Sequence, residues 1–204
     1  MLSKTFCTAL AVACVAQAAQ AGIISYTNMA VWNAQVASAG MSVETETFNA
    51  IADGFYSSPF GGSTASVTWG ASAAGGLYVQ GGVFSTNNPV TLDFTFTPGV
   101  RAVAGNFFGT DIGFNNATVL FTVQLSDGTG YTGFASSPSD FTGFRSTTAA
   151  TISGLSITVE NAVGAGAVYP SVDNLYFGVV PVPAPGAVAL LGAAGLAASR
   201  RRRA

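Results

Sequence analysis

A strict alternation of apolar and polar residues constrains the fold of this chain more than any other feature. Val90, Leu92, Phe94 and Phe96 alternate with polar neighbours, and the segment at 118–126 repeats the pattern. An apolar residue at every second position puts one face of a β-strand into a core and leaves the opposite face in water. The pattern therefore predicts strands that belong to sheets with one buried face.

Further segments with strand-like composition follow one another through the rest of the chain, at 43–48, 65–69, 77–84, 102–108, 130–134, 141–145, 152–160 and 174–179. The Gly-, Ser- and Pro-rich stretch at 53–63 is predicted to be a loop, and Asp127 with Gly128 is predicted to form a type I′ turn. About ten short strands separated by Gly-rich turns predict a single all-β domain, a jelly-roll-like β-sandwich.

A short helix is predicted ahead of the first strand. Thr27 or Asn28 can cap its N-terminus, and Gly40 can end it. Its apolar face is formed by residues at helical spacing, Met29, Trp32 and Val36. This helix and the sandwich together make up the predicted body of the protein, residues 22–180.

The N-terminal segment, residues 1–21, has the three parts of a secretory signal peptide. Lys4 supplies a positive charge and residues 5–16 form an apolar stretch. Small residues then provide a cleavage site. The predicted site is the A-x-A pattern of Ala19 and Ala21, with cleavage before Gly22.

Both cysteines, Cys7 and Cys14, lie inside this N-terminal segment. An alternative interpretation is a lipoprotein acylated at Cys14, although the apolar stretch ahead of that residue is short. Once the signal peptide is removed the chain has no thiol, so its stability has to come from burial rather than from disulfides. A body of about 160 residues is long enough for one sizeable core.

The last part of the chain, residues 181–204, combines three features in a fixed order. Prolines at 181, 183 and 185 keep the backbone extended and accessible. An uncharged run at 186–198 follows, and a helix over this run would be about 20 Å long, shorter than the ~30 Å hydrocarbon core of a membrane. The basic end, Arg200, Arg201, Arg202 and Arg203, would stay cytoplasmic. These features predict transient membrane insertion, with a permanent C-terminal anchor as the alternative.

The order and spacing of these features resemble the C-terminal sorting signal of PEP-CTERM proteins, which Gram-negative bacteria export and an exosortase processes. The motif is carried here by Val182, Pro183, Ala184 and Pro185, with Ala184 in the place of the usual Glu. The resemblance implies cleavage near this motif by an exosortase-type enzyme, followed by delivery to the cell surface or the extracellular matrix.

A weaker resemblance lies in the body. The segment Glu46-Thr47-Phe48 and the closing segment 172–177, which reads Val-Asp-Asn-Leu-Tyr-Phe, are similar to segments of many PEP-CTERM bodies and of carbohydrate-binding jelly rolls. This resemblance supports the predicted fold and implies no particular activity.

The charge of the predicted body excludes several functions. Arg101 and Arg145 stand against nine acids, which is a net charge of 2 − 9 = −7, and the body contains neither Lys nor His. Nucleic acid is not a predicted partner, because phosphates need a basic face. Without His, Lys or Cys, a Ser nucleophile lacks its usual bases and zinc lacks its usual ligands. A glycan hydrolase or lyase that uses two facing carboxyl groups is the remaining enzymatic alternative.

Glu46 near the first strand and Asp173 near the last are candidate calcium ligands, because a jelly roll brings its terminal strands together and calcium prefers oxygen ligands. Asp53 or backbone carbonyls would complete the shell. The competing interpretation is that Glu44 and Glu46 form the solvent side of an alternating strand and that Asp173 caps a turn. No cofactor other than calcium is predicted.

Trp69, Tyr78 and Tyr131 are candidate sugar-binding residues, because their Ser-, Thr- and Gly-rich surroundings favour exposed rings that stack on pyranose faces. The competing interpretation places Trp69 in the core, where most Phe residues, Phe114 included, are also expected. As a whole the sequence predicts an exported, surface-sorted, non-catalytic β-sandwich protein that binds extracellular polysaccharide. A purely structural surface protein is a further alternative.

Overall fold

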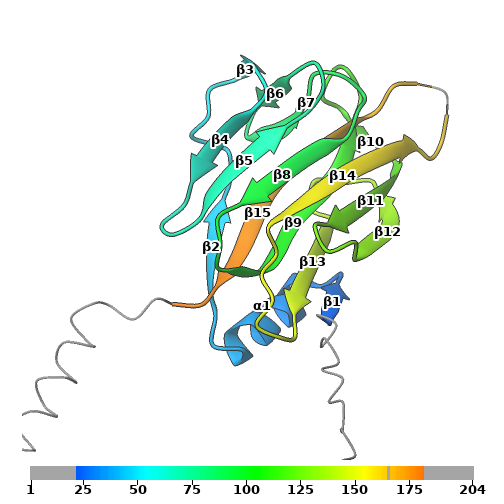
Figure 1. Ribbon diagram of the computed structural model, residues 1–204. Coiled ribbons are helices and arrows are strands. Elements are labelled where there is room, and N and C mark those ends of the chain that lie inside the picture. Colours follow the sequence, from blue (N-terminus) through cyan, green and yellow to red (C-terminus); the bar gives the residue numbers. More distant parts are fainter. Residues whose placement is uncertain (1–21, 165, 182–204) are drawn as a thin grey trace, which may run out of the picture.

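The computed structural model describes residues 22–164 and 166–181, and these residues form a sandwich of two antiparallel β-sheets with one short helix (Figure 1). The prediction of an all-β sandwich is therefore confirmed. The predicted signal peptide with Ala19 and Ala21, and the predicted sorting residues 182–185 and 200–203, lie outside the described residues. Within the described ranges, no helix is long and apolar enough to cross a membrane.

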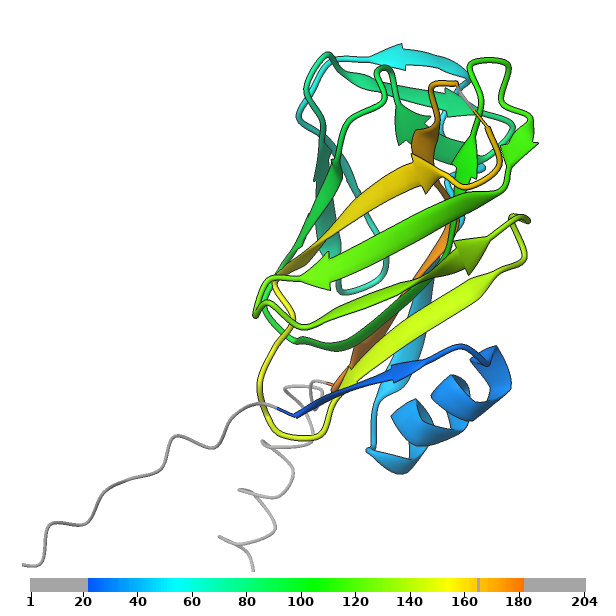
Figure 2. The ribbon, with the colours of Figure 1, turned by 90° about the vertical axis from the view of Figure 1, so that its right-hand side faces the viewer.

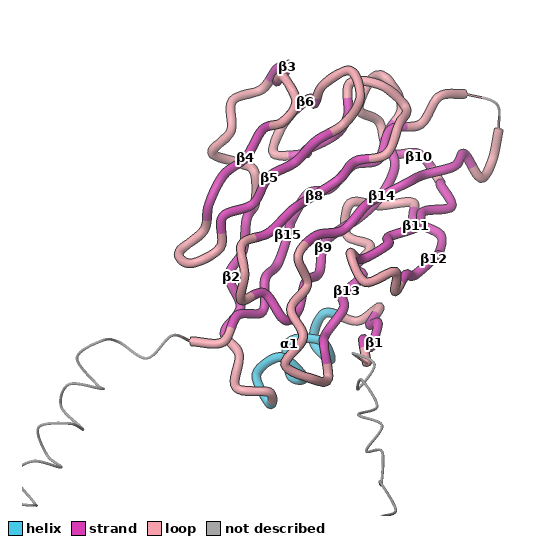
Figure 3. Tube along the Cα trace, in the orientation of Figure 1, coloured by secondary structure: helices cyan, strands magenta, loops and turns pink. Residues whose placement is uncertain are grey.

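In the described chain the larger sheet has nine strands and the smaller sheet has six. The larger sheet runs in the order β1 (Ile23–Tyr26), β13 (Phe141–Ser146), β9 (Val100–Thr110), β15 (Tyr169–Val179), β7 (Val83–Thr86), β6 (Leu77–Gln80) and β3 (Gly54–Tyr56), while β10 (Asn116–Ala117) pairs with β9 and β2 (Ser42–Glu46) pairs with β15. The smaller sheet runs in the order β12 (Gly130–Ala135), β11 (Val119–Leu125), β14 (Gly154–Asn161), β8 (Leu92–Phe96), β5 (Thr68–Ser72) and β4 (Phe60–Ser63). Figure 3 shows how far strands dominate the chain, with α1 (Met29–Ser38) at one end.

The connections between the two sheets have jelly-roll topology. From β7 onward the long strands pass alternately between the sheets, except at the β11–β12 hairpin. As a result β7, β15, β9 and β13 are neighbours in the larger sheet, and β8, β14, β11 and β12 are neighbours in the smaller sheet. These two sets of four are the layers of an eight-stranded jelly roll, as predicted.

Burial follows the alternation in the two strands that indicated it most clearly. Phe94 on β8 and Val123 on β11 are buried, whereas their neighbours Thr95 and Gln124 are exposed. Each strand therefore turns its apolar residues toward the opposite sheet and its polar residues toward water.

The predicted strand at 77–84 is a hairpin in the structure. β6 ends at Gln80, β7 begins at Val83, and the intervening Gly81 and Gly82 have φ angles of 58° and 81°. Positive φ at both central positions is the pattern of a type I′ turn, which glycine adopts without a steric penalty. The sequence pattern predicted one strand because apolar residues stand on both sides of the Gly-Gly pair.

Other strands differ from the prediction because pairing with neighbouring strands, rather than local composition, determines where they form. The stretch at 53–63, predicted to be a loop, contains β3, which pairs with β6, and β4, which pairs with β5. Gly, Ser and Pro disfavour strands locally, but cross-strand packing overrides that preference. Strands β1 and β10 were not predicted, because four and two residues are too few to show an alternation.

The turn at Asp127 and Gly128 is not of type I′, which corrects the prediction. Gly128 has a φ of 87°, whereas Asp127 does not have a positive φ. The carboxylate of Asp127 instead accepts hydrogen bonds from the backbone N of Thr129 at 2.9 Å and from its hydroxyl at 3.1 Å. The hairpin thus closes through a longer loop in which Gly128 takes the left-handed conformation.

Helix α1 begins where the sequence predicts. Oδ1 of Asn28 accepts a hydrogen bond from the backbone N of Val31 at 3.0 Å, which satisfies one free amide of the first turn. Trp32 and Val36 are buried as predicted. Met29, in the first turn, is 39% exposed and does not share in the buried face.

Helix α1 packs against the outer face of the larger sheet (Figure 2). The indole Nε1 of Trp32 donates to the carbonyl O of Phe144 on β13 at 3.1 Å. A Cβ atom on Gly143 would lie 2.7 Å from Cδ1 of Trp32 and 2.9 Å from Cβ of Ala104. Glycine at this position therefore allows the helix to approach the sheet closely.

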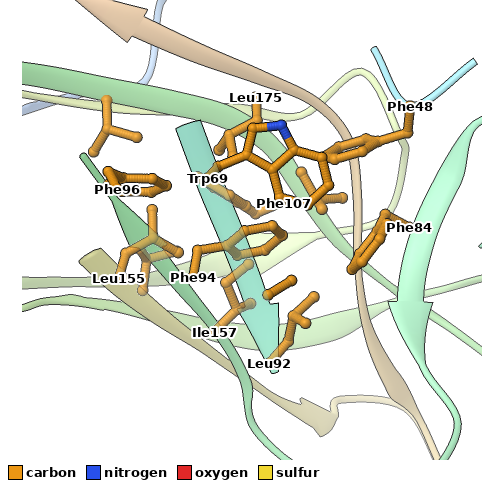
Figure 4. Close-up of a cluster of buried hydrophobic side chains, with 14 of the residues drawn as sticks. Phe48, Trp69, Phe84, Leu92, Phe94, Phe96, Phe107, Leu155, Ile157 and Leu175 are labelled. Carbon is orange, nitrogen blue, oxygen red and sulfur yellow. The ribbon is translucent and has the colours of Figure 1, made fainter. Parts of the chain in front are cut away.

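The main core fills the space between the sheets (Figure 4). The ring centroid of Phe48 lies 5.4 Å from that of Trp69, 5.0 Å from that of Phe84 and 6.5 Å from that of Phe94. Packed aromatic rings stabilise a core beyond the burial of their area. Phe48 has a φ of 58°, and its backbone N donates to Oε1 of Glu46 at 2.8 Å, which fixes the end of β2.

Candidate functional site

A cleft of about 230 Å³ lies between the β6–β7 hairpin and the loop that follows β9. Figure 1 shows the elements on both sides of it at the end of the sandwich away from α1. We call it the Tyr78 cleft. Its lining combines aromatic rings, amides, hydroxyls, an aliphatic side chain and a carboxylate, from Tyr78, Gln80, Thr86, Asn87, Asp111, Ile112, Phe114 and Tyr169. A hollow of about 280 Å³ on β8, β11 and β14 has Phe94 as its aromatic residue, and that ring is buried in the core.

Tyr78 is the one predicted sugar-binding residue that lines this cleft. Its ring contacts Phe114 with a centroid distance of 5.3 Å and an interplanar angle of 46°. Tyr78 on β6 also lies directly opposite Phe55 on β3, which is 56% exposed. Residues directly opposite one another in an antiparallel pair share a face of the sheet. An aromatic surface therefore leads from Phe55 to the cleft.

Asp111 fixes the loop that forms one wall of the cleft. Its Oδ1 accepts hydrogen bonds from the backbone N of Gly113 at 2.7 Å and of Asn115 at 3.0 Å. The side-chain amide of Asn115 donates to Oδ1 at 3.2 Å and to Oδ2 at 3.0 Å. These bonds, those from Asn115 first, hold the pKa of Asp111 below its ordinary value of 3.8, so the carboxylate is ionised at neutral pH. The closed loop places Phe114, with a φ of 59°, against Tyr78.

Three buried hydroxyl groups fix the strands beneath the cleft. Ser85 on β7, Ser171 on β15 and Thr110 on β9 are almost fully buried. The Oγ of Ser171 lies 3.0 Å from Oγ of Ser85, 2.9 Å from Oγ1 of Thr110 and 3.2 Å from the carbonyl O of Tyr169. A buried network with satisfied hydrogen bonds rigidifies its surroundings. It joins the strands from which Tyr169 and the Asp111 loop extend.

Strand β15 connects the Tyr78 cleft to the opposite end of the sandwich. Tyr169, its first residue, lines the cleft, and Val179, its last, leads to the end of the described chain. The 11 residues of β15 span about 35 Å at ~3.3 Å per residue. Strand β1 also lies at the end away from the cleft (Figure 1). Gly22, directly before β1, accepts a hydrogen bond through its carbonyl O from the backbone N of Thr147 at 2.8 Å.

The other two predicted sugar-binding residues lie elsewhere. Trp69 is 2% exposed, and its Nε1 donates to Oε2 of Glu46 at 3.0 Å. It is therefore a core residue, as the competing interpretation held, because it occupies an inward-facing position of β5. Tyr131 on β12 is half-buried, and its ring centroid lies 5.8 Å from that of Phe121, against the main core. Tyr131 does not line the Tyr78 cleft.

The two predicted calcium ligands have separate hydrogen-bond partners. Both carboxylate oxygens of Glu46 accept bonds, from the backbone N of Phe48 and from Trp69. Oδ2 of Asp173 accepts a bond from Nδ2 of Asn174 at 3.1 Å, and burial raises the pKa of Asp173 against the effect of that bond. Among the residues that the structure describes, no group of three or more Asp, Glu, His or Cys side chains is placed to bind a metal ion. Calcium binding stays a prediction.

Most of the cleft residues were missed by sequence reasoning. Phe114 was expected in the core, and Asp111 and Tyr169 were not singled out. The Asp-x-Gly-x-Asn spacing at 111–115 is the local signal that could have indicated a closed loop, because Asp side chains accept bonds from backbone amides just ahead of them.

No family model matches the chain, and no curated protein matches it. Among solved structures, the chain is similar to a carbohydrate-binding module of family 29, with 10% sequence identity, coverage of 67% of this chain and 89% of that chain, and a TM-score of 0.35. It is similar to a mutant of CBM29-2 in complex with mannohexaose, at 11% identity, 68% and 92% coverage and a TM-score of 0.35. A second mutant, in complex with cellulohexaose, gives 11% identity, 67% and 91% coverage and a TM-score of 0.34.

Proposed function

We propose that this protein is an exported, non-catalytic β-sandwich that binds polysaccharide in the Tyr78 cleft. The observation that carries the proposal is the grouping of three aromatic residues, Tyr78, Phe114 and Tyr169, with the amides of Gln80 and Asn87 around one cleft. Aromatic rings stack on the apolar faces of pyranose rings, and amides bind sugar hydroxyls from both sides as donors and acceptors.

The size of the cleft suits part of a polymer rather than a whole ligand. Its volume of about 230 Å³ is below the ~300–1,000 Å³ typical of pockets that enclose drug-sized molecules. One sugar unit would lie against Tyr78 and Phe114, and the chain would continue over the exposed ring of Phe55. An open-ended contact of this kind allows a polymer to bind along its length.

The cleft favours binding over hydrolysis. Asp111 is the one acid among its lining residues, whereas a glycosidase needs two carboxyl groups about 5–10 Å apart, one of them protonated. The hydrogen bonds from Asn115 keep the pKa of Asp111 low, so this carboxyl does not supply a proton at neutral pH. A glycan hydrolase or lyase is thus the weaker alternative. A purely structural role would not explain why three aromatic residues are grouped around one cleft.

Affinity electrophoresis of the full chain in gels that contain soluble polysaccharides tests this proposal. We expect at least one polysaccharide to retard the protein relative to a gel without polysaccharide, and we expect no oligosaccharides to be released on incubation. Retardation accompanied by released oligosaccharides would establish the enzymatic alternative. Unchanged mobility in every gel would contradict polysaccharide binding.

We also propose that the chain is sorted to the cell surface through its C-terminal segment, after cleavage by an exosortase-type enzyme near Val182 to Pro185. Support comes from the order of the motif, the apolar run and the four arginines in the sequence. The fold fits this proposal, because β15 separates Tyr169 from Val179 by about 35 Å. Attachment or release at the Val179 end would leave the cleft facing outward.

Mass spectrometry of surface-extracted protein tests the sorting proposal. We expect a mature chain that begins at Gly22 and ends near Pro185, and we expect replacement of the four arginines at 200–203 by Ser to leave uncleaved protein. An intact C-terminal Arg-rich peptide on the membrane-bound mature form would establish a simple anchor instead. Acylated Cys14 at the N-terminus would establish a lipoprotein.

A further inference from the structure

We infer that the polysaccharide bound in the Tyr78 cleft is uncharged, and that acidic polysaccharides are excluded from the cleft by charge repulsion. The inference rests on the proposed polysaccharide binding and names the class of polymer. Across residues 22–181 there are nine Asp and Glu residues and two arginines, a net charge of 2 − 9 = −7. A net charge of this sign repels anionic partners unless cations gather at the site.

Both arginines are engaged far from the cleft. The guanidinium of Arg101 donates from Nη2 to the carbonyl O of Thr148. That of Arg145 donates from Nε to the hydroxyl of Tyr26 at 3.4 Å and from Nη1 to the carbonyl O of Ser146 at 3.3 Å. Neither arginine lines the cleft. Arg101 thus joins β9 to the loop after β13, and Arg145 joins the last residues of β1 and β13.

The separation between these cations and the cleft is large on the scale of electrostatic screening. Arg101 is the second residue of β9, and Asp111 directly follows the last residue of the same strand. Ten residues of strand span about 33 Å, which is several times the ~8 Å Debye length at physiological ionic strength. Arg145 lies at the same end of β9, because it pairs with Ala102. An anionic sugar in the cleft would therefore gain almost nothing from either arginine.

The charges that do lie at the cleft are negative. Asp111 lines it, and its hydrogen bonds to Gly113 and Asn115 keep the carboxylate ionised at neutral pH. Oδ1 of Asp53 accepts a bond from the backbone N of Gly81 at 2.8 Å, next to Gln80 in the cleft wall. Like charges brought together at an interface disfavour the wrong partner. A uronate or sulfate ester placed here would face the carboxylate of Asp111, with the carboxylate of Asp53 beside the cleft wall.

Hydroxyl groups fit the same surroundings. Oδ2 of Asp111 accepts one hydrogen bond, from Asn115, and keeps capacity to accept another from a sugar hydroxyl. The exposed amide of Gln80 offers donors and an acceptor. Nδ2 of Asn87 donates one bond to the carbonyl O of Gly75 at 3.3 Å and keeps a second N–H and the side-chain carbonyl O. A sugar carboxylate is an acceptor only and cannot donate to Asp111. The cleft thus matches polymers whose polar groups are hydroxyls.

The test compares neutral polysaccharides with the same polymers oxidised at C6 to uronic acids, so that the two ligands differ in charge and little else. Isothermal titration calorimetry of the full chain is run at low and at high ionic strength. We expect the neutral polymer to bind at least tenfold more tightly at low ionic strength, and we expect the difference to shrink as salt screens the repulsion.

A matched pair of variants assigns the effect to the cleft. Gln80→Lys adds a cation to the cleft wall and should improve binding of the oxidised polymer severalfold. Gln124→Lys adds the same charge on the outer face of β11, outside the cleft, and should leave that binding as in the wild type.

Three results would overturn the inference. Equal or tighter binding of the oxidised polymer by the wild type would overturn it while leaving polysaccharide binding intact. Exclusion that persists at high salt and in Gln80→Lys would show that shape rather than charge discriminates. Binding of neither polymer would remove the proposed function itself, and this inference with it.

Discussion

The indole Nε1 of Trp69 on β5 donates a hydrogen bond to Oε2 of Glu46 on β2 at 3.0 Å. One side-chain pair therefore ties the smaller sheet to the larger sheet at the margin of the core. The other oxygen of Glu46 accepts the backbone N of Phe48 at 2.8 Å, so the carboxylate has a partner on each side. Two residues that sequence reasoning assigned to separate surface sites meet in a structural contact.

Replacing Glu46 should destabilise the fold through this contact. Glu46→Ala leaves the Trp69 indole and the Phe48 amide without their acceptor, and a buried unsatisfied donor costs about 1–3 kcal/mol. Glu46→Gln keeps one acceptor oxygen and should therefore lose less stability than Glu46→Ala. Glu160→Ala, at an exposed position of β14, should change stability by no more than ~0.5 kcal/mol. Chemical denaturation measures the free energy of unfolding of all three variants. An equal loss of stability in Glu46→Ala and Glu160→Ala would contradict the role of Glu46 in joining the two sheets.

The neighbouring Glu44 should make stability depend on pH. Its carboxylate accepts bonds from the hydroxyl of Thr64 at 2.5 Å and from Ser66 through its hydroxyl at 2.5 Å and its backbone N at 2.9 Å. Burial acts to raise the pKa of Glu44, but these bonds together outweigh it and hold the pKa below the ordinary value of 4.5. The stabilisation is therefore fully present above pH 4.5 and is lost as pH falls through the lower, folded-state pKa.

Denaturation curves of the wild type and of Glu44→Gln over a pH series check this sign. We expect the wild type to be the more stable at neutral pH, by less than about 1 kcal/mol because Glu44 is only half-buried and water screens its charge. The difference should vanish in acid. A difference that stays constant from acid to neutral pH would exclude Glu44 as its source.

Gly143 should be intolerant of a methyl group. A Cβ there would lie 2.7 Å from Cδ1 of Trp32 and 2.9 Å from Cβ of Ala104, so Gly143→Ala forces α1 away from the larger sheet. Overpacking of this kind costs about 1–3 kcal/mol. The matched control is Gly164→Ala, because a Cβ on Gly164 would meet nothing within 4 Å. Thermal unfolding compares the two, and equal melting temperatures would show that α1 is not held by this contact.

The sequence predicted those parts of the fold in which local pattern and tertiary burial agree. β8 and β11 alternate cleanly because each has one face in the core and one in water, and Asn28 caps α1 as its side chain suggests. Strands β3 and β4 were missed because their Gly-, Ser- and Pro-rich composition opposes a strand. They exist because β6 and β5 pair with them.

The cleft was harder to predict, because its residues come from distant segments. Tyr78 was found from its surroundings, but Phe114 and Tyr169 join it through the jelly-roll connections rather than through any local pattern. Trp69 shows the converse. Its Gly and Thr neighbours suggested exposure, but they face outward while the indole points into the core. Local composition does not indicate which side of a strand is buried.

Polysaccharide binding at Tyr78 is the central claim, and isothermal titration calorimetry of the full chain with a polysaccharide that retards it in affinity electrophoresis tests this claim most directly. Phe134→Ala is the matched control, because Phe134 is an aromatic residue that is 73% exposed on β12 and lies outside the cleft. We predict that Tyr78→Ala raises Kd about tenfold, equivalent to ~1.4 kcal/mol, while Phe134→Ala binds like the wild type. Unchanged binding by Tyr78→Ala, or a loss confined to Phe134→Ala, would contradict the account.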